Sequence, residues 1–319
     1  MVSLICPACG KKALEEGDKL SCSSCGAVYI KKDGIISFTG DAGFYEGKFQ
    51  TTHCEKKPRN FLNKLLYRCY EIFSVNYAQQ RIRFIKKNLP DRGEILDIGC
   101  GGGIEGVARP GRTVTGVDIS LPSLRKAICV YDRAVQADIV SLNFAGDSFD
   151  GIIASEILGH LESMKRVKVL EEIGRVLKKE GKVIITVETL GALRRKAEKT
   201  DRDLYRQYLV EQYGHFGLRE PRQVLSEIEE AGFIVEKCKG VFSYWWPSLQ
   251  MLEAFDNEYR KKDRKIGRWV GIVRIFSGKI WLRELFDLFC SVICWPLELA
   301  AGENDPNELY LVLKKNGKG

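Results

Sequence analysis

Apolar and polar residues follow two different periods along this chain. Short apolar runs, bounded by glycine or polar residues, are typical of buried strands. They predict strands at 94–98, 113–118, 134–138, 149–154, 182–187, 233–238 and 308–314. Apolar residues that recur every three or four positions predict helices at 61–88, 167–178, 194–212 and 222–230. Strands that alternate with helices indicate an α/β chain with a doubly wound, seven-stranded sheet.

A glycine-rich turn follows the first predicted strand. Gly99, Gly101 and Gly103 have no Cβ, so the backbone can turn sharply there and lie close to a ligand. A strand, such a turn and a helix together form the cofactor-binding unit of doubly wound sheets. The helix should lie within 104–112, but that stretch is short and contains Pro110, so we expect only one or two helical turns.

Two classes of cofactor compete for this turn. Gly101, Gly103 and Gly106 satisfy G-x-G-x-x-G, which is typical of dinucleotide sites. Asp97, two residues before the first glycine, would repel a pyrophosphate. The same carboxylate suits a cationic ligand without phosphates. S-adenosylmethionine, with its sulfonium and ammonium groups, is such a ligand, and we favour it.

The next two predicted strands also end in an acid. Asp118 is placed to accept both ribose hydroxyls, and Asp138 is placed to meet the adenine amino group. Each carboxylate has an alternative role as a helix cap or turn residue. Three consecutive strands that close in aspartate favour one shared ligand over three separate caps.

Four segments, 96–103, 116–120, 137–138 and 147–156, resemble the ordered motifs of class I S-adenosylmethionine-dependent methyltransferases, of the type 11 kind. The resemblance runs from about Glu94 to Val187 and resumes near the end of the chain. It implies a Rossmann-like sheet whose last two strands pair antiparallel, and it says little about the methyl acceptor. The cofactor-binding residues that it implies are Asp97, Gly99, Cys100, Gly101, Gly103, Asp118, Ile119, Asp138, Ile139, Ser155 and Glu156.

The same resemblance implies two residues on the acceptor side. The stretch 155–161 resembles the Glu-x-x-x-His element that follows the fourth strand in this family. His160 is therefore a candidate catalytic base, with a structural hydrogen bond as the alternative. His215 lies where the family commonly places a substrate-facing residue, and it is a candidate catalytic residue that contacts the acceptor.

Cys6, Cys9, Cys22 and Cys25 form two C-x2-C pairs separated by twelve residues. Four thiolates at this spacing predict a closed, tetrahedral structural Zn²⁺ site, and two reactive thiol pairs are the alternative. A unit this small needs a metal to fold. The segment resembles the zinc ribbons that precede the methyltransferase domain in several families, one of which methylates ribosomal RNA guanine.

These features divide the chain into a zinc ribbon (1–40), a linker with a leading helix (41–90) and a methyltransferase domain (91–319). His53 and Cys54 are adjacent in the linker. They are part either of a second metal site or of a solvated loop. The resemblance implies that the leading helix covers the cofactor, with Tyr77 and Arg81 on it.

A helical insertion is expected at 241–307, between the last two strands. It contains all five tryptophans of the chain, and 260–283 within it holds nine lysines and arginines against one acid. The net charge of +8 is therefore concentrated rather than spread over the surface. Such a segment can form a lid over the cleft, lie in a membrane interface, or bind RNA through phosphates and stacked bases.

Eleven cysteines without a basic-then-apolar leader indicate a reducing cytoplasm. No apolar run reaches the ~20 residues of a membrane span, so contact of 241–307 with a membrane would be peripheral. The fourth strand is followed neither by Asn/Asp-Pro-Pro-Tyr/Phe, the element for exocyclic amines of bases, nor by a Pro-Cys nucleophile for pyrimidine carbon 5.

We therefore predict an S-adenosylmethionine-dependent methyltransferase for a small or lipid-like acceptor. RNA methylation, with the ribbon and the insertion as the grip, is the first alternative. A non-catalytic binding or scaffold protein that retains the fold is the second.

Overall fold

The computed structural model describes residues 2–39, 77–191, 194–195, 198–199, 202–206, 211, 214–241, 282, 285, 289, 292 and 305–317. Two compact units divide the chain: 1–55 with 85–239 and 305–319, and 56–84 with 240–304. The predictions for His53, Cys54, the side chain of Tyr77 and the five tryptophans lie outside the described residues. The prediction for Arg81 and the domain limits stay predictions.

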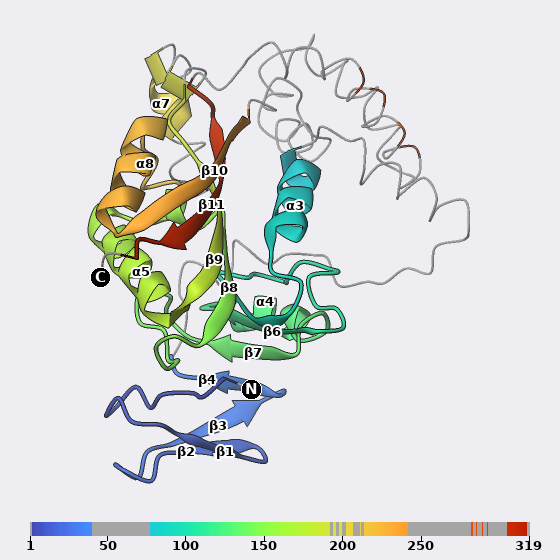
Figure 1. Cartoon of the computed structure of the whole chain (residues 1–319), viewed down its shortest axis with the longest axis vertical. Helices are drawn as coiled ribbons and strands as arrows, with labels where there is room; N and C mark the ends of the chain where they lie inside the picture. Colours follow the sequence, from blue (N-terminus) through green and yellow to red (C-terminus); the bar gives the residue numbers. More distant parts are fainter. Residues whose placement is uncertain are drawn as a thin grey trace. The chain divides into compact units, whose positions relative to one another are not determined.

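Seven strands form the Rossmann-like sheet that the sequence predicts (Figure 1). They are β5 (Gly93–Ile98), β6 (Arg112–Asp118), β7 (Arg133–Gln136), β8 (Phe149–Ser155), β9 (Leu177–Glu188), β10 (Phe233–Val241) and β11 (Glu308–Lys315). Their order is β7-β6-β5-β8-β9-β11-β10. The pairs β5–β6, β6–β7, β5–β8 and β8–β9 are parallel, and β11 is antiparallel to β9. The strand order reverses at β5, and ligands of such sheets bind outside the carboxyl ends of the strands at this point.

The central strands are buried because both of their faces carry apolar side chains. Ile95, Leu96 and Ile98 on β5 and Ile152 and Ile153 on β8 have no measurable exposed surface. A strand that is covered on both faces needs a continuous apolar run rather than an alternating one. This is why these runs could be identified in the sequence.

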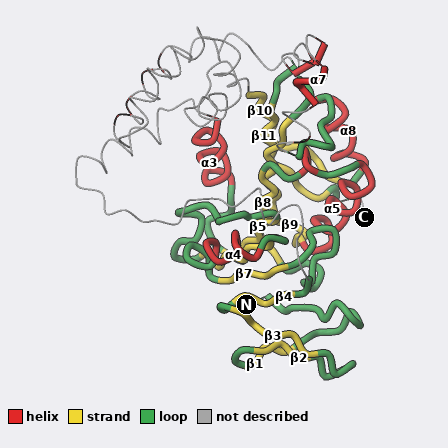
Figure 2. Tube along the Cα trace, turned by 180° about the vertical axis from the view of Figure 1, so that it is seen from behind, coloured by secondary structure: helices red, strands yellow, loops and turns green. Residues whose placement is uncertain are grey.

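Four short N-terminal strands extend the same sheet beyond β7. They are β1 (Leu14–Glu16), β2 (Lys19–Ser21), β3 (Val28–Lys32) and β4 (Ile35–Ser37). Ile36 of β4 pairs in parallel register with Val135 of β7, and Leu4 forms a bridge with Phe144. Figures 1 and 2 show these strands at the β7 edge. The N-terminal segment and the larger sheet therefore share hydrogen bonds and one hydrophobic core.

The described helices are α3 (Tyr77–Asn88), α4 (Leu121–Ala127), the 3₁₀ turn η1 (Leu158–His160), α5 (Ser163–Val176), α7 (Arg202–Tyr205) and α8 (Pro221–Glu230). α8 begins at Pro221, as predicted, because proline at the first helical position loses no hydrogen bond. α7 and the helical positions 194, 195, 198 and 199 lie within the predicted helix 194–212. No described helix is long and apolar enough to cross a membrane.

The stretch after the glycine turn differs from the prediction. No helical turn forms between Ile104 and Arg112; the backbone makes bends and turns instead. The Arg112 side chain is buried, and it donates to the main-chain oxygens of Pro90 (2.6 Å) and Leu89 (3.2 Å). These hydrogen bonds, rather than a helix, hold the stretch in place.

Two element boundaries were also predicted wrongly. The helix predicted at 167–178 runs instead from Ser163 to Val176 as α5, and β9 begins at Leu177, before the predicted strand of 182–187. The predicted strand of 134–138 ends at Gln136, two residues before Asp138. Lys179 and Glu180 are exposed polar residues near the start of β9, so the apolar run that identified the strand begins only after them.

Candidate active site

The glycine turn at the carboxyl end of β5 has the left-handed backbone that the sequence predicts. Gly99, Gly101 and Gly103 have φ values of 63°, 52° and 81°. A Cβ on Gly99 would come within 2.3 Å of Cγ2 of Ile157, which follows β8. Only glycine fits there, because the turn packs directly against the end of the neighbouring strand. This contact links the turn to η1 and its histidine.

Asp118 is connected to the glycine turn by hydrogen bonds. Its Oδ2 accepts from the N–H of Gly101 at 2.8 Å, and its Oδ1 accepts from the N–H of Ser120 at 2.8 Å. Burial raises the pKa of Asp118, although these backbone hydrogen bonds act in the opposite direction. Each oxygen retains a second lone pair, so the carboxylate can still accept from a ligand hydroxyl.

Asp97 is nearly fully buried and interacts with a tyrosine. The Tyr131 hydroxyl donates to Oδ2 of Asp97 at 2.6 Å and accepts from the N–H of Ile104 at 2.7 Å. Burial, followed by the nearby Asp97 charge, raises the pKa of Tyr131 well above its usual range, which keeps the hydroxyl protonated as a donor. Tyr131 therefore connects the first carboxylate to the far side of the turn.

Four further residues of the predicted cofactor set follow the ends of β5, β6 and β7 in the chain. Cys100 is buried, with Sγ under Gly116. Ile119 and Ile139 are half-buried, as apolar walls of a crevice would be. Asp138 accepts from the N–H of Val140 at 3.1 Å, which is the turn role that the sequence left open for it.

The end of β8 carries a strained residue. Glu156 has a φ of 58°, a region that few residues other than glycine adopt. Its Oε1 accepts from the hydroxyl of Thr186 at 2.8 Å, and that hydroxyl lies 3.0 Å from the Ser155 hydroxyl. Such strain persists where the surroundings hold it and is typical of functional sites.

Beyond Glu156, two distant histidines and a glutamate meet. The ring centroids of His160 and His215 are 4.7 Å apart. Nε2 of His215 lies 2.6 Å from Oε2 of Glu188, the last residue of β9. Burial, followed by the proximity of His215, lowers the pKa of His160. Burial alone would raise the pKa of Glu188, but His215 and Arg194 lower it well below its usual range, so the carboxylate is ionised.

Further polar contacts hold each member of this group. Nδ1 of His160 lies 3.1 Å from the main-chain oxygen of Gly214, and Arg194 donates to Oε1 of Glu188 at 3.3 Å. Arg194 also donates to the main-chain oxygens of Thr189 (2.8 Å) and Asn307 (3.0 Å).

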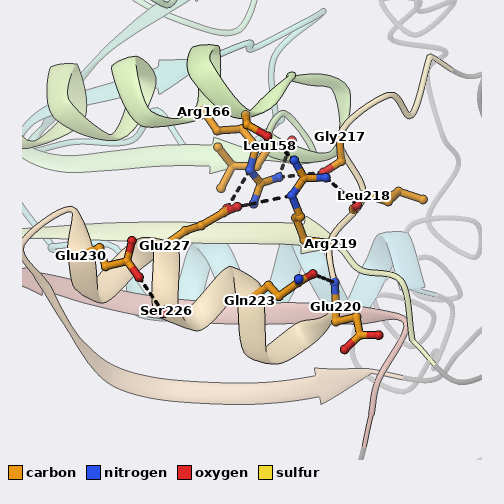
Figure 3. Close-up of polar contacts among 11 residues, drawn as sticks. Leu158, Arg166, Gly217, Leu218, Arg219, Glu220, Gln223, Ser226, Glu227 and Glu230 are labelled. Carbon is orange, nitrogen blue, oxygen red and sulfur yellow. Dashed lines mark hydrogen bonds and ion pairs between the residues drawn. The ribbon is translucent and has the colours of Figure 1, made fainter.

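A buried arginine fastens the two loops that carry the histidines (Figure 3). Arg166 on α5 donates to the main-chain oxygens of Leu158 (2.7 Å) and Gly217 (3.2 Å). Its Nε donates to Oε2 of Glu227 on α8 at 2.8 Å. The N–H of Gly217 also donates to the oxygen of Gly159 at 2.9 Å. The geometry around His160 and His215 is therefore fixed from α5 and α8.

The four N-terminal cysteines gather at one point. Sγ of Cys6 lies 3.7 Å from Sγ of Cys25, and Sγ of Cys9 lies 3.5 Å from Sγ of Cys22. Zn–S bonds of about 2.3 Å put the sulfurs of a tetrahedral site about 3.8 Å apart. The N–H groups of Ala8 and Cys9 point to Sγ of Cys6, and those of Ser24 and Cys25 point to Sγ of Cys22.

Sequence reasoning placed His160 and His215 on the acceptor side, but missed Tyr131, Glu188, Arg166 and Arg194. Glu188 had a usable signal: an acid that directly follows the apolar run of the fifth strand, like the three aspartates before it. Arg166 had none, because an arginine on an amphipathic helix normally faces solvent.

Comparison with known proteins gives matches to part of the chain. Residues 96–185 match a family described as a methyltransferase domain. A tRNA (carboxymethyluridine(34)-5-O)-methyltransferase of Arabidopsis thaliana is 30% identical over 131 residues, which are 39% of this chain and 32% of the relative. The human mitochondrial ubiquinone biosynthesis O-methyltransferase is 31% identical over 105 residues, 29% of this chain and 28% of the relative. The chain spans less than half the length of either.

Among solved structures, phosphoethanolamine N-methyltransferase 2 of Haemonchus contortus in complex with S-adenosyl-L-methionine has a TM-score of 0.44 and 21% identity. The match covers 74% of this chain and 52% of that chain.

Proposed function

We propose, from the premise that residues 96–185 are a methyltransferase domain, that this chain transfers a methyl group from S-adenosylmethionine to a small-molecule acceptor. The observation that carries the choice of cofactor is the missing helix after the glycine turn. A dinucleotide site holds its pyrophosphate on the N-terminus of that helix. Here the turn runs into bends, and a buried carboxylate, Asp97, precedes it.

The proposed cofactor fits the residues around the turn. Asp118, held by the N–H groups of Gly101 and Ser120, would accept the ribose hydroxyls. Ile119 and Ile139 would flank the adenine, and Asp138 would lie at its amino group. Asp97 would offset the positive charge of the methionine part. The cofactor supplies an electrophilic methyl group, and the protein contributes proximity and orientation.

His160 and His215 are the proposed catalytic residues on the acceptor side. Ligands of parallel sheets bind at the carboxyl ends of the strands, and both histidines lie beside the ends of β8 and β9. Ser155 and Glu156 lie between them and the glycine turn in the chain. A methyl acceptor in the crevice would therefore contact the imidazoles on one side and the methyl donor on the other.

The four-cysteine unit is the proposed structural zinc site. The two sulfur–sulfur separations of 3.5 and 3.7 Å fit a tetrahedral ion, and four thiolates leave no open position for catalysis. The pairing of β4 with β7 supports a role for this unit in completing the sheet edge. RNA methylation is the alternative function. The name of the plant relative gives tRNA as that relative's own substrate.

The insertion of 241–307 is proposed to contact a lipid surface or a lipid-like acceptor. Leu285, Phe289 and Val292 are exposed by 49%, 63% and 67%. Their spacing of four and three residues puts them on one face of a helix. The basic stretch 260–283 precedes them in the sequence, and basic residues next to an apolar face suit the surface of an anionic membrane.

Two experiments test the proposal. Calorimetry with S-adenosylmethionine and with NAD should give binding of the former alone; binding of NAD alone would overturn the cofactor assignment. Transfer of labelled methyl from S-adenosylmethionine should then be measured into fractionated small molecules, lipids and RNA. Label in RNA alone, with a steep dependence on salt, would move the function to the alternative. No transfer to any fraction would favour a non-catalytic scaffold protein.

A further inference from the structure

We propose that His160, His215 and Glu188 bind one divalent transition-metal ion, and that this ion holds an oxygen of the methyl acceptor. The inference deepens the proposed function, since the ion would act on the same acceptor beside the same two histidines. Binding of the ion depends only on the three side chains, so it can be tested without methyl transfer.

The three side chains form a donor set that such ions prefer. Each offers one ligand atom, and these atoms all lie within 4.8 Å of one another. Two imidazoles and one carboxylate on one side of an ion leave its other positions open for substrate, as in the facial triad of transition-metal enzymes. Metal–ligand bonds of about 2.1 Å put neighbouring donors about 3 Å apart. Oε2 of Glu188 and Nε2 of His215 are 2.6 Å apart in a hydrogen bond, and an ion would take the place of its proton.

Second contacts orient the donors in the way that metal sites need. With its proton on Nδ1, His160 donates to the main-chain oxygen of Gly214, and Nε2 is the ring nitrogen that would bind an ion. Arg194 engages Oε1 of Glu188 and leaves Oε2 toward His215. Partners of this kind fix the ring orientation and the carboxylate of a metal site. Among the described residues, no second group of histidines and carboxylates meets in this way.

The charges around the site indicate the chemical class of the acceptor. The charge of Glu188 is balanced by Arg194, so these side chains together are close to neutral when both imidazoles are neutral. A divalent ion would add two positive charges to a site where His215 and Glu188 are nearly buried. An acceptor with an ionised oxygen offsets part of that charge. We therefore infer an acceptor hydroxyl that ionises on binding, such as a phenol or an enol.

The proposed step balances without a further reactant. The acceptor hydroxyl releases its proton to solvent when its oxygen binds the ion. A lone pair of that oxygen forms the new bond to the methyl carbon, the carbon–sulfur bond breaks, and its electron pair stays on sulfur. One neutral thioether, one methyl ether and one proton result, and the ion is unchanged.

Titration with Mn²⁺ tests the site in the full-length protein. Mn²⁺ prefers nitrogen and oxygen donors, so the four cysteines compete little for it. Calorimetry and the paramagnetic signal of free Mn²⁺ should show one bound ion per chain. Affinity should fall by about tenfold or more in Glu188→Gln and in His160→Ala, because each change removes a ligand. Glu236→Gln is the matched control, since Glu236 binds Lys314 on the far part of the sheet and should leave the affinity unchanged.

A second measurement reads the site directly. The chain has only three histidines, His53, His160 and His215. Bound Mn²⁺ should broaden the imidazole signals of His160 and His215 in the unchanged protein but not in Glu188→Gln. Absence of Mn²⁺ binding, or equal affinity in all variants, would overturn the inference. Methyl transfer without Mn²⁺ binding would reject the metal site and keep the proposed function. Mn²⁺ binding without transfer to any acceptor would keep the metal site and reject the proposed function.

Discussion

The imidazole rings of His160 and His215 lie 4.7 Å apart, although one belongs to a turn after β8 and the other to a loop before α8. No local pattern brings these two segments together. Arg166 does so by hydrogen bonding to both loops, and Glu227 holds Arg166 from α8. The candidate acceptor site therefore depends on the ion pair between the buried Arg166 and Glu227.

Replacing Arg166 by methionine tests this dependence. The substitution removes the donors to Leu158 and Gly217 and leaves Glu227 without its main partner. We expect a loss of about 2–3 kcal/mol in unfolding free energy, discounted because the Glu227 side chain is 26% exposed. Urea unfolding measures the loss. Ser226→Ala, on the same helix, removes only an exposed hydrogen bond to Glu230 and should change stability by under about 0.5 kcal/mol.

Gly217→Ala tests the fit between the two histidine loops. An added Cβ would come within 1.8 Å of the main-chain oxygen of Leu161, so the loop must move away from η1. We expect a destabilisation of about 1–3 kcal/mol, together with weaker acceptor binding. Gly174→Ala is the control, because its Cβ would only touch the Phe233 ring at 3.7 Å and alanine favours a helix. Equal stability of the two variants in thermal unfolding would contradict the packing described here.

Asp118→Asn tests the assignment of the ribose contact. The change keeps the side-chain volume but removes the charge that accepts from the N–H groups of Gly101 and Ser120. Affinity for S-adenosylmethionine should fall by about tenfold or more, the equivalent of one charge-assisted hydrogen bond. Calorimetry measures it. Asp147→Asn, an exposed aspartate that pairs with Lys315, should bind the cofactor like the unchanged protein.

Removal of zinc tests the N-terminal unit. Elemental analysis should give one zinc per chain, and Cys9→Ser should lose it. Because β4 pairs with β7, and Leu4 and Cys22 belong to the common core, metal loss should lower the melting temperature of the larger sheet as well. Cys129→Ser, at an exposed cysteine outside this unit, should retain both zinc and stability. Absence of zinc from the purified protein, or an unchanged melting temperature after chelation, would argue that the cysteines form two reactive thiol pairs instead.

Much of the fold could be predicted from local pattern. Buried parallel strands need continuous apolar runs, so the five parallel strands of the larger sheet, β5 to β9, were identifiable one by one. The glycines of the turn and the acids at the strand ends could also be identified, because left-handed backbone and strand ends each restrict the residue types that they accept. The boundary between α5 and β9 could not, since Lys179 and Glu180 are as compatible with a helix end as with an exposed stretch of strand.

The sequence alone could not predict which distant segments of the chain contact one another. The pairing of β4 with β7, the contact of Tyr131 with Asp97, and the contact of Glu188 with His215 all join residues far apart in the chain. The sequence by itself determined the period of each element, the glycine turn and the row of strand-end carboxylates, because these are properties of neighbouring residues. Only the tertiary structure decided which side chains face one another in the crevice, because burial and electrostatic pairing act through space rather than along the chain.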